Sequence, residues 1–417
     1  MPRSAKQTPF TLKTKVGCGD LLVLDAPHLY DRDGGLYTDN SGRDWPDNPE
    51  RFAALSYVAA HLCADGLGKW RPDIVHGHDW QAGLIGEFQR ALASDAVQVP
   101  FVFTIHNVAF HGTTSPDRLD ALSLRKDRFT PDHFEFWGQI STLKAALTKA
   151  DRITTVSKTY AEELMTPEFG MGMDGVLRAR AGVLTGIVNG IDTDVWDPAN
   201  DSELKPYKSP NGKRSNKKAL QAEFGLPNSK GPLCVLISRL TEQKGIDLLL
   251  NALPALLSRG GQLALLGSGD PELEVALLER ASVEVNMSVR IGYDEALSHR
   301  MMGGGDAILV PSRFEPCGLT QLYGLRYGTV PLVALTGGLA DTVINANSAA
   351  LAKGVATGLQ FSPVTANALA NAFDRLCDLY FDSKTWGAMQ RNAMKQPVGW
   401  DSSAAEYAAL YTQLLSN

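Results

Sequence analysis

This chain of 417 residues is organised around the segment PSRFEPCGLTQLYGLRYG, residues 311–328. The segment begins where the apolar run at residues 307–310 ends. A run of strand length that stops at Pro-Ser and resumes with Leu322, Leu325 and Tyr327 predicts a buried strand, a tight turn and a helix. The turn is therefore the first candidate site.

This turn carries groups that can hold an anion. If the helix opens at Gly318, Leu319 and Thr320, its free backbone N–H groups, the positive end of its dipole and the Thr320 hydroxyl face one point. Phosphate is a common ligand of such helix starts. Glu315 lies just before, where it could hold a sugar attached to that phosphate. Taken alone, the same residues could simply cap a helix, so the rest of the chain must decide.

Apolar runs of strand length alternate with helical patterns along the chain. The runs lie at residues 21–25, 74–76, 101–106 and 153–157 in the first half, and at 233–238, 263–267, 288–292, 307–311 and 330–334 in the second. Helical patterns separate them, for example at residues 246–257 and 272–281. This alternation predicts an α/β fold of parallel strands with helical crossovers. We expect two doubly wound parallel-sheet domains.

The domain bounds follow from this rhythm. We expect a first domain at residues 1–185, a second at 186–395 and a final segment at 396–417. Residues 1–15 are polar and are expected to be disordered. Residues 200–218 are rich in Lys, Ser, Pro and Asn, which is typical of an exposed loop near the domain junction.

The C-terminal segment has the pattern of a helix. Ser403 and Glu406 have the spacing of a capping box, which predicts that the helix begins there. One face of it collects six residues: Ala404, Tyr407, Ala408, Tyr411, Leu414 and Leu415. We expect that face to be packed.

Composition excludes several classes of function. The net charge is -6 and no Lys/Arg stripe occurs, which disfavours nucleic acids and membrane surfaces as partners. The five cysteines are scattered without metal-ligand spacing, as expected for reduced thiols in a cytoplasmic protein. The N-terminus has no apolar segment of the signal-peptide type, and no apolar run reaches about 18 residues. We therefore expect a cytoplasmic protein without a membrane span.

Two basic residues follow one strand of the second half. Arg239 and Lys244 are expected in a loop at the carboxyl end of that strand, the edge at which open α/β sheets bind ligands. Alone they could be solvated surface residues. Together with the turn at Gly318 they could neutralise a diphosphate, since each charge-assisted hydrogen bond contributes roughly 1.5–3 kcal/mol.

Two glycine-rich turns follow other strands of the second half. Residues 267–270 lack the G-x-G-x-x-G spacing of a dinucleotide site, so a tight strand-to-helix turn is expected there. Thr336 and Gly337 lie in a turn where the backbone could approach a sugar or phosphate closely.

The first half places polar residues after two of its strands. His76 and His78 are expected to point to opposite faces of a strand, which disfavours a metal site. His76 could be a hydrogen-bonded core histidine. Asp79 and His106 are better placed to hold sugar hydroxyls. No metal and no cofactor are expected.

The long motifs resemble the bacterial glycogen synthase family. They include HGHDWQAGL, FTIHN, GQISTLKAAL, TTVSKTYAEE and GIVNGID in the first half, and SRLTEQKG, LLGSGDPE, TGGLADTV and the whole segment at residues 292–333 in the second. The resemblance runs from about Leu21 to the C-terminus. It implies a GT-B fold with two Rossmann-like domains, in which the last helix crosses back to the first domain.

The resemblance also implies a reaction and its residues. Glucose would pass from ADP-glucose to the non-reducing 4-hydroxyl of glycogen or another α-1,4-glucan, with retention and without a metal. Arg239 and Lys244 would stabilise the departing ADP. Gly318, Leu319 and Thr320 would contact the phosphates, and Cys317 would belong to the same substrate site. Glu315 would contact the donor glucose as a catalytic residue. The sugar site would be lined by Asp79, His106 and Asn189, and Tyr293 would pack near the adenine. Tyr323 stands where sucrose-synthase-type enzymes carry a second Glu.

The N-terminal region departs from the family pattern. Family members open with a strand and a Lys-x-Gly-Gly-Leu motif, which residues 15–19 imitate only superficially, with no strand expected before them. We expect the first domain to lack its opening portion, at a cost on the order of 10²–10³ in rate.

Three functions therefore stay open. The first is an active glycogen synthase, and the second is an impaired remnant that only binds ADP or glucan. The third is a transferase with UDP-glucose or another acceptor. The sequence does not decide between a covalent intermediate on Glu315 and front-face attack, and the resemblance favours the latter. It says nothing of oligomeric state.

Overall fold

The computed structural model describes residues 10–16, 19–92 and 98–416. The chain forms two compact units. The first comprises the residues up to Thr155, Ala161–Thr185 and the residues from Leu410 on, and the second comprises Val156–Tyr160 and Gly186–Ala409. No helix in this described part combines the length and the apolar character that crossing a bilayer requires.

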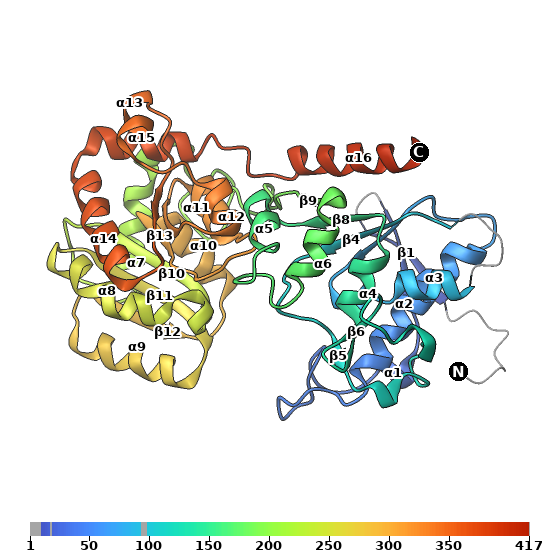
Figure 1. Cartoon of the computed structure of the whole chain (residues 1–417). Coiled ribbons are helices and arrows are strands. Elements are labelled where there is room, and N and C mark those ends of the chain that lie inside the picture. Colours follow the sequence, from blue (N-terminus) through green and yellow to red (C-terminus); the bar gives the residue numbers. More distant parts are fainter. Residues whose placement is uncertain (1–9, 17–18, 93–97, 417) are drawn as a thin grey trace. The chain divides into compact units, whose positions relative to one another are not determined.

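The second unit is built on a parallel sheet of six strands (Figure 1). Their order is β12-β11-β10-β13-β14-β15. The bounds are β10 Leu233–Leu240, β11 Gln262–Gly269, β12 Met287–Ile291, β13 Ala307–Val310, β14 Val330–Ala334 and β15 Leu359–Phe361. The five runs predicted in the second half are all strands here. Residues 307–310 are fully apolar because both faces of this central strand are buried.

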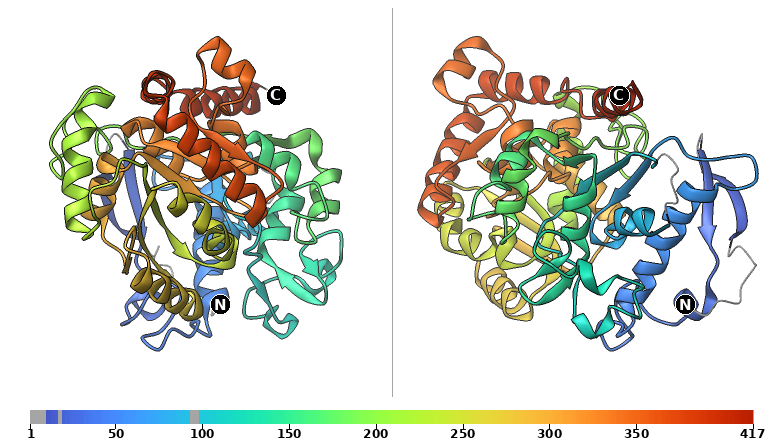
Figure 2. Two further views of the ribbon diagram at one scale, coloured as in Figure 1. Left: turned by 90° about the vertical axis from the view of Figure 1, so that its left-hand side faces the viewer. Right: turned by 45° about the vertical axis from the view of Figure 1, so that its right-hand side comes forward.

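Helices cover this sheet on both sides, as Figure 2 shows. They are α7 Lys213–Glu223, α8 Ile246–Ser258, α9 Pro271–Val283, α10 Glu295–Gly304, α11 Thr320–Tyr327, α12 Gly337–Thr342, α13 Ser348–Lys353, α14 Ala366–Phe381 and α15 Ser383–Ala393. The predicted turn at residues 267–270 is confirmed, because Asp270 accepts a hydrogen bond from the Glu272 N–H and so caps α9. The core between the layers includes Leu236, Leu265 and Phe373.

The order of strands places a ligand site in the second unit. The chain adds β11 and β12 on one side of β10, then returns to add β13, β14 and β15 on the other. In open α/β sheets, ligands bind at the carboxyl ends of the strands where this direction reverses. That point lies between β10 and β13, which are followed by Lys244 and Glu315 respectively.

The first unit contains a sheet in the order β3-β4-β8-β9, in which β3, β4 and β8 run parallel. The strands are β3 Val75–His78, β4 Phe101–Ile105, β8 Arg152–Thr155 and β9 Leu184–Gly186. Its helices are α1 Pro27–Tyr30, α2 Asn48–Asp65, α3 Ile85–Leu92, α4 Thr142–Lys149 and α6 Asp174–Ala179, and α5 Lys158–Glu163 has residues in both units. Three of the four runs predicted in the first half belong to this sheet.

The fourth run pairs elsewhere. Residues 21–25 fall in β2 Gly19–Leu24, which forms an antiparallel hairpin with β1 Phe10–Val16. The expectation that residues 1–15 are disordered, and that no strand precedes residues 15–19, was therefore wrong for β1. Residues 1–9, 17 and 18 lie outside the described part of the chain. Leu12 pairs with Val23 and Thr14 with Leu21, and apolar and β-branched residues of this kind favour strands, a signal that the polar composition of residues 1–15 obscured.

The segment at residues 200–218 is another correction. It is not an exposed loop, because α7 begins at Lys213 and the side chains of Asp201, Tyr207 and Lys213 are buried. The Lys213 ammonium donates to backbone oxygens of Met302, Gly303 and Tyr327 at 2.9–3.1 Å. Polar side chains can be buried here because they make hydrogen bonds within the protein. Composition alone does not reveal these hydrogen bonds.

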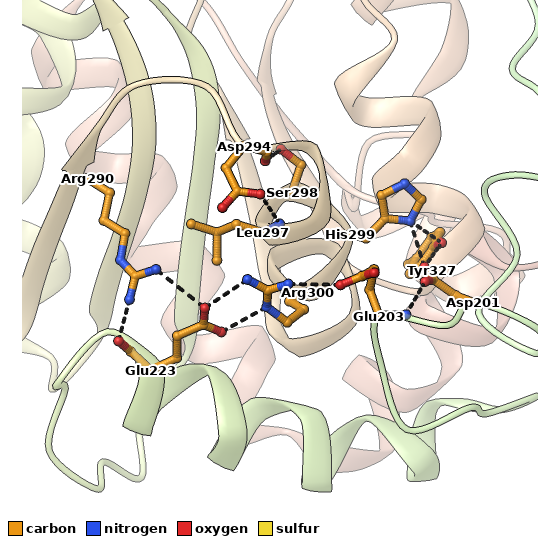
Figure 3. A network of polar contacts seen from close by, with 10 residues as sticks. All are labelled: Asp201, Glu203, Glu223, Arg290, Asp294, Leu297, Ser298, His299, Arg300 and Tyr327. Atoms are coloured by element: carbon orange, nitrogen blue, oxygen red, sulfur yellow. Dashed lines mark hydrogen bonds and ion pairs between the residues drawn. The ribbon is translucent and has the colours of Figure 1, made fainter.

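Figure 3 shows the neighbouring network of polar side chains in the second unit. Arg300 of α10 bonds Glu223 of α7, and Glu223 also pairs with Arg290 of β12. His299 and Tyr327 both bond the Asp201 carboxylate, at 2.7 and 2.5 Å. The segment is thus tied to α10 and α11.

The last helix, α16, spans Asp401–Ser416. It begins before the predicted capping box, and the Ser403 hydroxyl instead bonds the Val188 carbonyl. The predicted face is wrong in part, because Ala404, Ala408 and Leu415 are exposed whereas Ser403 and Leu410 are buried. Tyr407, Tyr411 and Leu414 are half-buried as expected.

Candidate active site

Lys244 and Glu315 meet at the switch point of the second unit. The Lys244 Nζ atom lies 2.6 Å from Glu315 Oε2, and the Ser312 hydroxyl donates to the same oxygen at 2.9 Å. Ser312 and Glu315 are buried, and Lys244 is half-buried. One carboxylate oxygen thus accepts two hydrogen bonds, which fixes the orientation of the group.

The loops that carry this pair are held together by Arg313. Its guanidinium makes two 2.7 Å bonds to the Asp247 carboxylate and donates to the Glu242 carbonyl. The backbones of the two loops are also joined directly, since the Arg313 N–H donates to the Gln243 carbonyl at 2.8 Å. Gly245 has φ 70°, and a Cβ there would lie 2.1 Å from the Pro311 carbonyl oxygen, so only glycine fits this crossing.

A small cavity of about 100 Å³ opens beside the pair. Its lining includes Ser238, Lys244, Glu315, Gly318, Leu319 and Thr320. Helix α11 begins at Thr320, as predicted, and Leu319 caps it without a side-chain bond. The N-terminal amides of the helix, a cation and a carboxylate therefore converge on one cavity, an arrangement that can hold a phosphate and a group attached to it.

The turn at Thr336 and Gly337 packs directly behind Glu315. The Gly338 N–H donates to the Glu315 and Pro316 carbonyls, both at 3.1 Å. A Cβ on Gly338 would lie 2.2 Å from the Cys317 carbonyl oxygen, so the close approach that the sequence predicts here is to this segment of the protein itself. Whether these residues also touch a ligand stays a prediction.

Cys317 and Asn189 are neighbours in this site. Burial raises the pKa of the Cys317 thiol to about 11, although the Asn189 backbone N–H donates to it. A thiol in this state is neutral at pH 7 and is no nucleophile. Its backbone carbonyl accepts a hydrogen bond from Gln321 at 3.0 Å, which shapes the start of α11.

Arg239 lies within β10 rather than in the loop beyond it. It pairs with Ser268 in β11, so the strand extends two residues past the predicted end. The side chain is exposed and makes no hydrogen bond or ion pair within the described residues. Its contact with a diphosphate stays a prediction.

Tyr293 and Tyr323 lie in different surroundings. The Tyr293 ring is 81% exposed, and its hydroxyl bonds Glu295 at 2.7 Å. Tyr323, on α11, stacks on Trp196 at a centroid distance of 3.8 Å, and His299 stacks on Trp196 at the same distance. Burial raises the pKa of Tyr323, helped by the nearby Glu295 carboxylate and Tyr293. Glu295 and both tyrosines therefore form one cluster beside the start of α11.

In the first unit, Asp79 and His106 are joined through the backbone. Asp79 accepts a hydrogen bond from the His106 N–H at 2.7 Å and has a strained φ of 53°. Burial raises the pKa of Asp79, partly offset by the backbone N–H groups of His106 and Asn107. Backbone strain of this kind concentrates at functional sites.

The histidines contradict one sequence expectation. His76 and His78 do not face opposite sides, because residues two apart in a strand share a face, and their rings stack at 4.3 Å. His78 contacts His106 at 3.0 Å, and His76 contacts Tyr411 and Thr104, both at 2.6 Å. His76 is thus a hydrogen-bonded core histidine. Over the described ranges, no three His, Cys, Asp or Glu residues form a metal-binding group.

Asp79 also lines a much larger cavity of about 710 Å³ within the first unit. Its aromatic lining comes from Tyr37, Trp45, Phe52, Trp80, Phe110 and His111, and its polar lining includes Asp44, Asn48, Gln81 and Asn107. No Lys or Arg is among the lining residues that the structure describes. Aromatic faces beside amides and carboxylates suit a neutral, hydroxyl-rich ligand.

Sequence reasoning missed several residues of these sites. Ser312 and the pair Arg313–Asp247 hold Glu315 and Lys244 but were not singled out. The position of Ser312 directly after a buried strand was the available signal. Trp80 and Asn107 follow Asp79 and His106 in the quoted motifs and could have been included on the same grounds.

Comparison with known proteins supports this description. Residues 7–179 match the family model "Starch synthase catalytic domain" and residues 217–396 match "Glycosyl transferases group 1". Glycogen synthase from Jannaschia sp. is 71% identical over 392 residues, covering 94% of this chain and 82% of that protein. Glycogen synthase from Paracoccus denitrificans is 59% identical, with 95% and 83% covered.

Solved structures agree at the level of the fold. The catalytic domain of starch synthase IV from Arabidopsis thaliana, bound to ADP and acarbose, has a TM-score of 0.85 at 32% identity, covering 95% of this chain and 82% of that one. Sucrose-phosphate synthase from Thermosynechococcus elongatus has a TM-score of 0.58 at 21% identity, covering 91% and 81%, which bears on the fold alone.

Two Rossmann-like sheets, with a cation, a carboxylate and a helix start at the switch point of the second, define a glycosyltransferase of the GT-B class. The identities narrow the class further. The chain belongs to the glycogen synthase family, and it is a glucosyltransferase.

Proposed function

We propose that the protein transfers glucose from ADP-glucose to the 4-hydroxyl at the non-reducing end of glycogen or another α-1,4-glucan, with retention of configuration. Family membership across 94% of the chain supports this reaction. The observation that carries it is the 2.6 Å contact of Lys244 with Glu315 at the cavity beside the start of α11.

The phosphate end of the donor would bind in this cavity. An ammonium group has three donors, so Lys244 can bond a phosphate oxygen while it keeps Glu315. Arg239 would supply a second charge from β10, and the amides of Gly318, Leu319 and Thr320 would supply further donors. These groups oppose the negative charge that develops on ADP as it leaves.

The sugar and the base would bind around this phosphate. Glu315 would hold the donor glucose, and Tyr293 would pack near the adenine with its ring exposed for contact. The remaining donor contacts that we propose are Asp79, His106, Asn189, Cys317, Thr336 and Gly337.

The charges favour a front-face reaction. The C1–O bond to phosphate breaks and its electron pair goes to ADP, which leaves an oxocarbenium-like glucose. The acceptor O4 bonds C1 on the same face, and its proton passes to a phosphate oxygen of the departing ADP. Glu315 would stabilise the positive sugar electrostatically, because Lys244 and Ser312 fix the orientation of its carboxylate through Oε2.

The acceptor would bind in the cavity of the first unit. The aromatic residues lining this cavity can stack on the apolar faces of glucose rings, while Asp44, Asn48 and Asn107 can accept or donate to hydroxyls. The absence of Lys and Arg among its described lining residues suits an uncharged polymer.

We also propose that the protein works in the cytoplasm. Cys63, Cys234, Cys317 and Cys377 are buried free thiols, which persist in a reducing compartment.

The test is glucose transfer from ADP-glucose to glycogen by the full chain. Lys244→Ala should lower kcat/KM roughly 10²–10³-fold, because it removes phosphate stabilisation and leaves the Glu315 carboxylate without its cation. The exposed Lys230→Ala is the matched control. Equal rates for Lys244→Ala and the wild type would contradict the proposal.

The same assay addresses the alternatives. A higher kcat/KM with UDP-glucose than with ADP-glucose would show that UDP-glucose is the donor. Retained ADP binding without turnover would indicate an impaired remnant, which family membership over nearly the whole chain does not favour.

A further inference from the structure

A strained aromatic turn stands out on the first unit. The hairpin of β6 Glu135–Phe136 and β7 Gln139–Ser141 turns through Trp137 and Gly138, with φ of 52° and 77°. Two positive φ values in a two-residue turn favour Asn-Gly, because asparagine tolerates this conformation and bulky residues do not. Trp137 nevertheless occupies the asparagine position, at a cost of about 1–2 kcal/mol.

Packing does not explain this choice. The Trp137 side chain is 82% exposed, so it contributes little to the core. The segment that packs against this turn contains a second strained residue, Met171, which has φ 47° and is 39% exposed. The next residue, Gly172, lies against the turn: a Cβ on it would be 3.1 Å from the Phe136 ring and 3.5 Å from Trp137 Nε1. Strained and exposed apolar residues in neighbouring segments indicate a binding surface.

This surface is continuous with the large cavity. Phe136 meets His111 edge-to-face at 5.0 Å, and Trp137 follows at 6.1 Å from Phe136. His111 lines the cavity, as do Gly112 and Thr113. Thr113–Thr114 is strand β5, which pairs with β7 of the same hairpin. The wall of the cavity and the aromatic turn therefore belong to one small sheet.

His111 shows what kind of group the ligand presents. Its ring bonds the backbone of Val108, and its Nε2 atom is buried without a hydrogen-bond partner among the described residues. Because a carbonyl only accepts, the ring nitrogen facing Val108 carries the proton, and Nε2 of the neutral ring is an acceptor. Burial lowers the pKa of His111, which keeps the ring neutral at pH 7. A group that bonds this nitrogen must therefore be a donor, such as a hydroxyl.

We propose that Phe136, Trp137 and Met171 form a glucan platform, which stacks glucose units of the acceptor chain that extend beyond the cavity past His111. This inference rests on the proposed function, because it takes the cavity as the acceptor site. The ligand is a neutral α-glucan long enough to leave the cavity. The strain at Trp137 is the cost of presenting its ring to that chain.

The test uses Trp137→Asn in the full chain, since asparagine suits the turn and should leave the melting temperature unchanged or raise it. Electrophoresis in native gels containing glycogen, without any donor, gives the dissociation constant from the retardation of mobility. Loss of one stacking ring should weaken binding roughly 3- to 10-fold. Trp137→Tyr should restore most of the binding, and the exposed Trp70→Ala should bind as the wild type does.

Kinetics give a second measurement. With Trp137→Asn, KM for glycogen should rise more than KM for maltotriose, which is short enough to stay within the cavity. Equal binding of glycogen by Trp137→Asn and the wild type would overturn the platform. So would a change of oligomeric state in light scattering without a change in glycogen binding, because the surface would then join two copies of the chain.

The two proposals fail separately. If the wild type transfers no glucose but its retardation by glycogen depends on Trp137, the platform stands and the proposed reaction fails. If transfer proceeds and Trp137 has no effect on either measurement, the reaction stands and the platform fails.

Discussion

Ser312 is expected to hold the carboxylate of the active site. It is 1% exposed and donates to Glu315 Oε2 at 2.9 Å, the same oxygen that Lys244 contacts. Ser312→Ala removes one of these two bonds, and burial leaves little room for water to replace it. A hydrogen bond to a charged group contributes roughly 1.5–3 kcal/mol. If that orientation matters fully in the transition state, kcat/KM falls roughly 10- to 150-fold.

Initial rates with saturating glycogen and varied ADP-glucose measure this effect. We expect kcat to fall while ADP still binds, because Lys244 and the start of α11 remain. The exposed Ser282→Ala, whose hydroxyl bonds only the Glu279 carbonyl, is the control for losing a serine hydroxyl. A kcat/KM within twofold of the wild type, with an unchanged melting temperature, would show that Ser312 does not position Glu315.

Two further predictions concern stability. Lys213→Met should lower the free energy of unfolding by on the order of 3 kcal/mol, because it strands the buried carbonyl oxygens of Met302, Gly303 and Tyr327; an unshifted urea midpoint would refute this. Burial lowers the pKa of His76 to about 3 and that of His78 to about 4, whereas an unfolded histidine titrates near 6.5. Stability should thus be full above about pH 6.5 and decline toward pH 5, because only the unfolded chain gains these protons. Urea unfolding across this range should show a slope that His78→Gln reduces, and a midpoint independent of pH would exclude the effect.

Local patterns predicted much of the second unit. The apolar run ending at Val310 and the helix starting at Thr320 lie where the sequence placed them, because both depend on short-range signals. Lys244 also shares a cavity with the start of α11, as the sequence led us to expect, since neighbouring parallel strands bring their carboxyl ends together. Its direct contact with Glu315 was not predicted.

The errors arose where tertiary contacts override composition. Lys213 looked like a loop residue, but its amine is buried, because most of its hydrogen-bond partners lie about 90–116 residues away. The helix face around Ala404 was misjudged for a similar reason, since periodicity allows several faces and packing selects one. The sequence did not single out Trp137. The unusual feature of this residue is its positive φ, which a pattern of polar and apolar residues does not reveal.

Each candidate site draws its described lining residues from one compact unit alone. Under the proposed assignment, phosphate binding and polymer binding are thus encoded in separate stretches of the gene. A lineage could alter the branch lengths it elongates through changes near Trp45 or Trp137, while inheriting the chemistry around Glu315 intact.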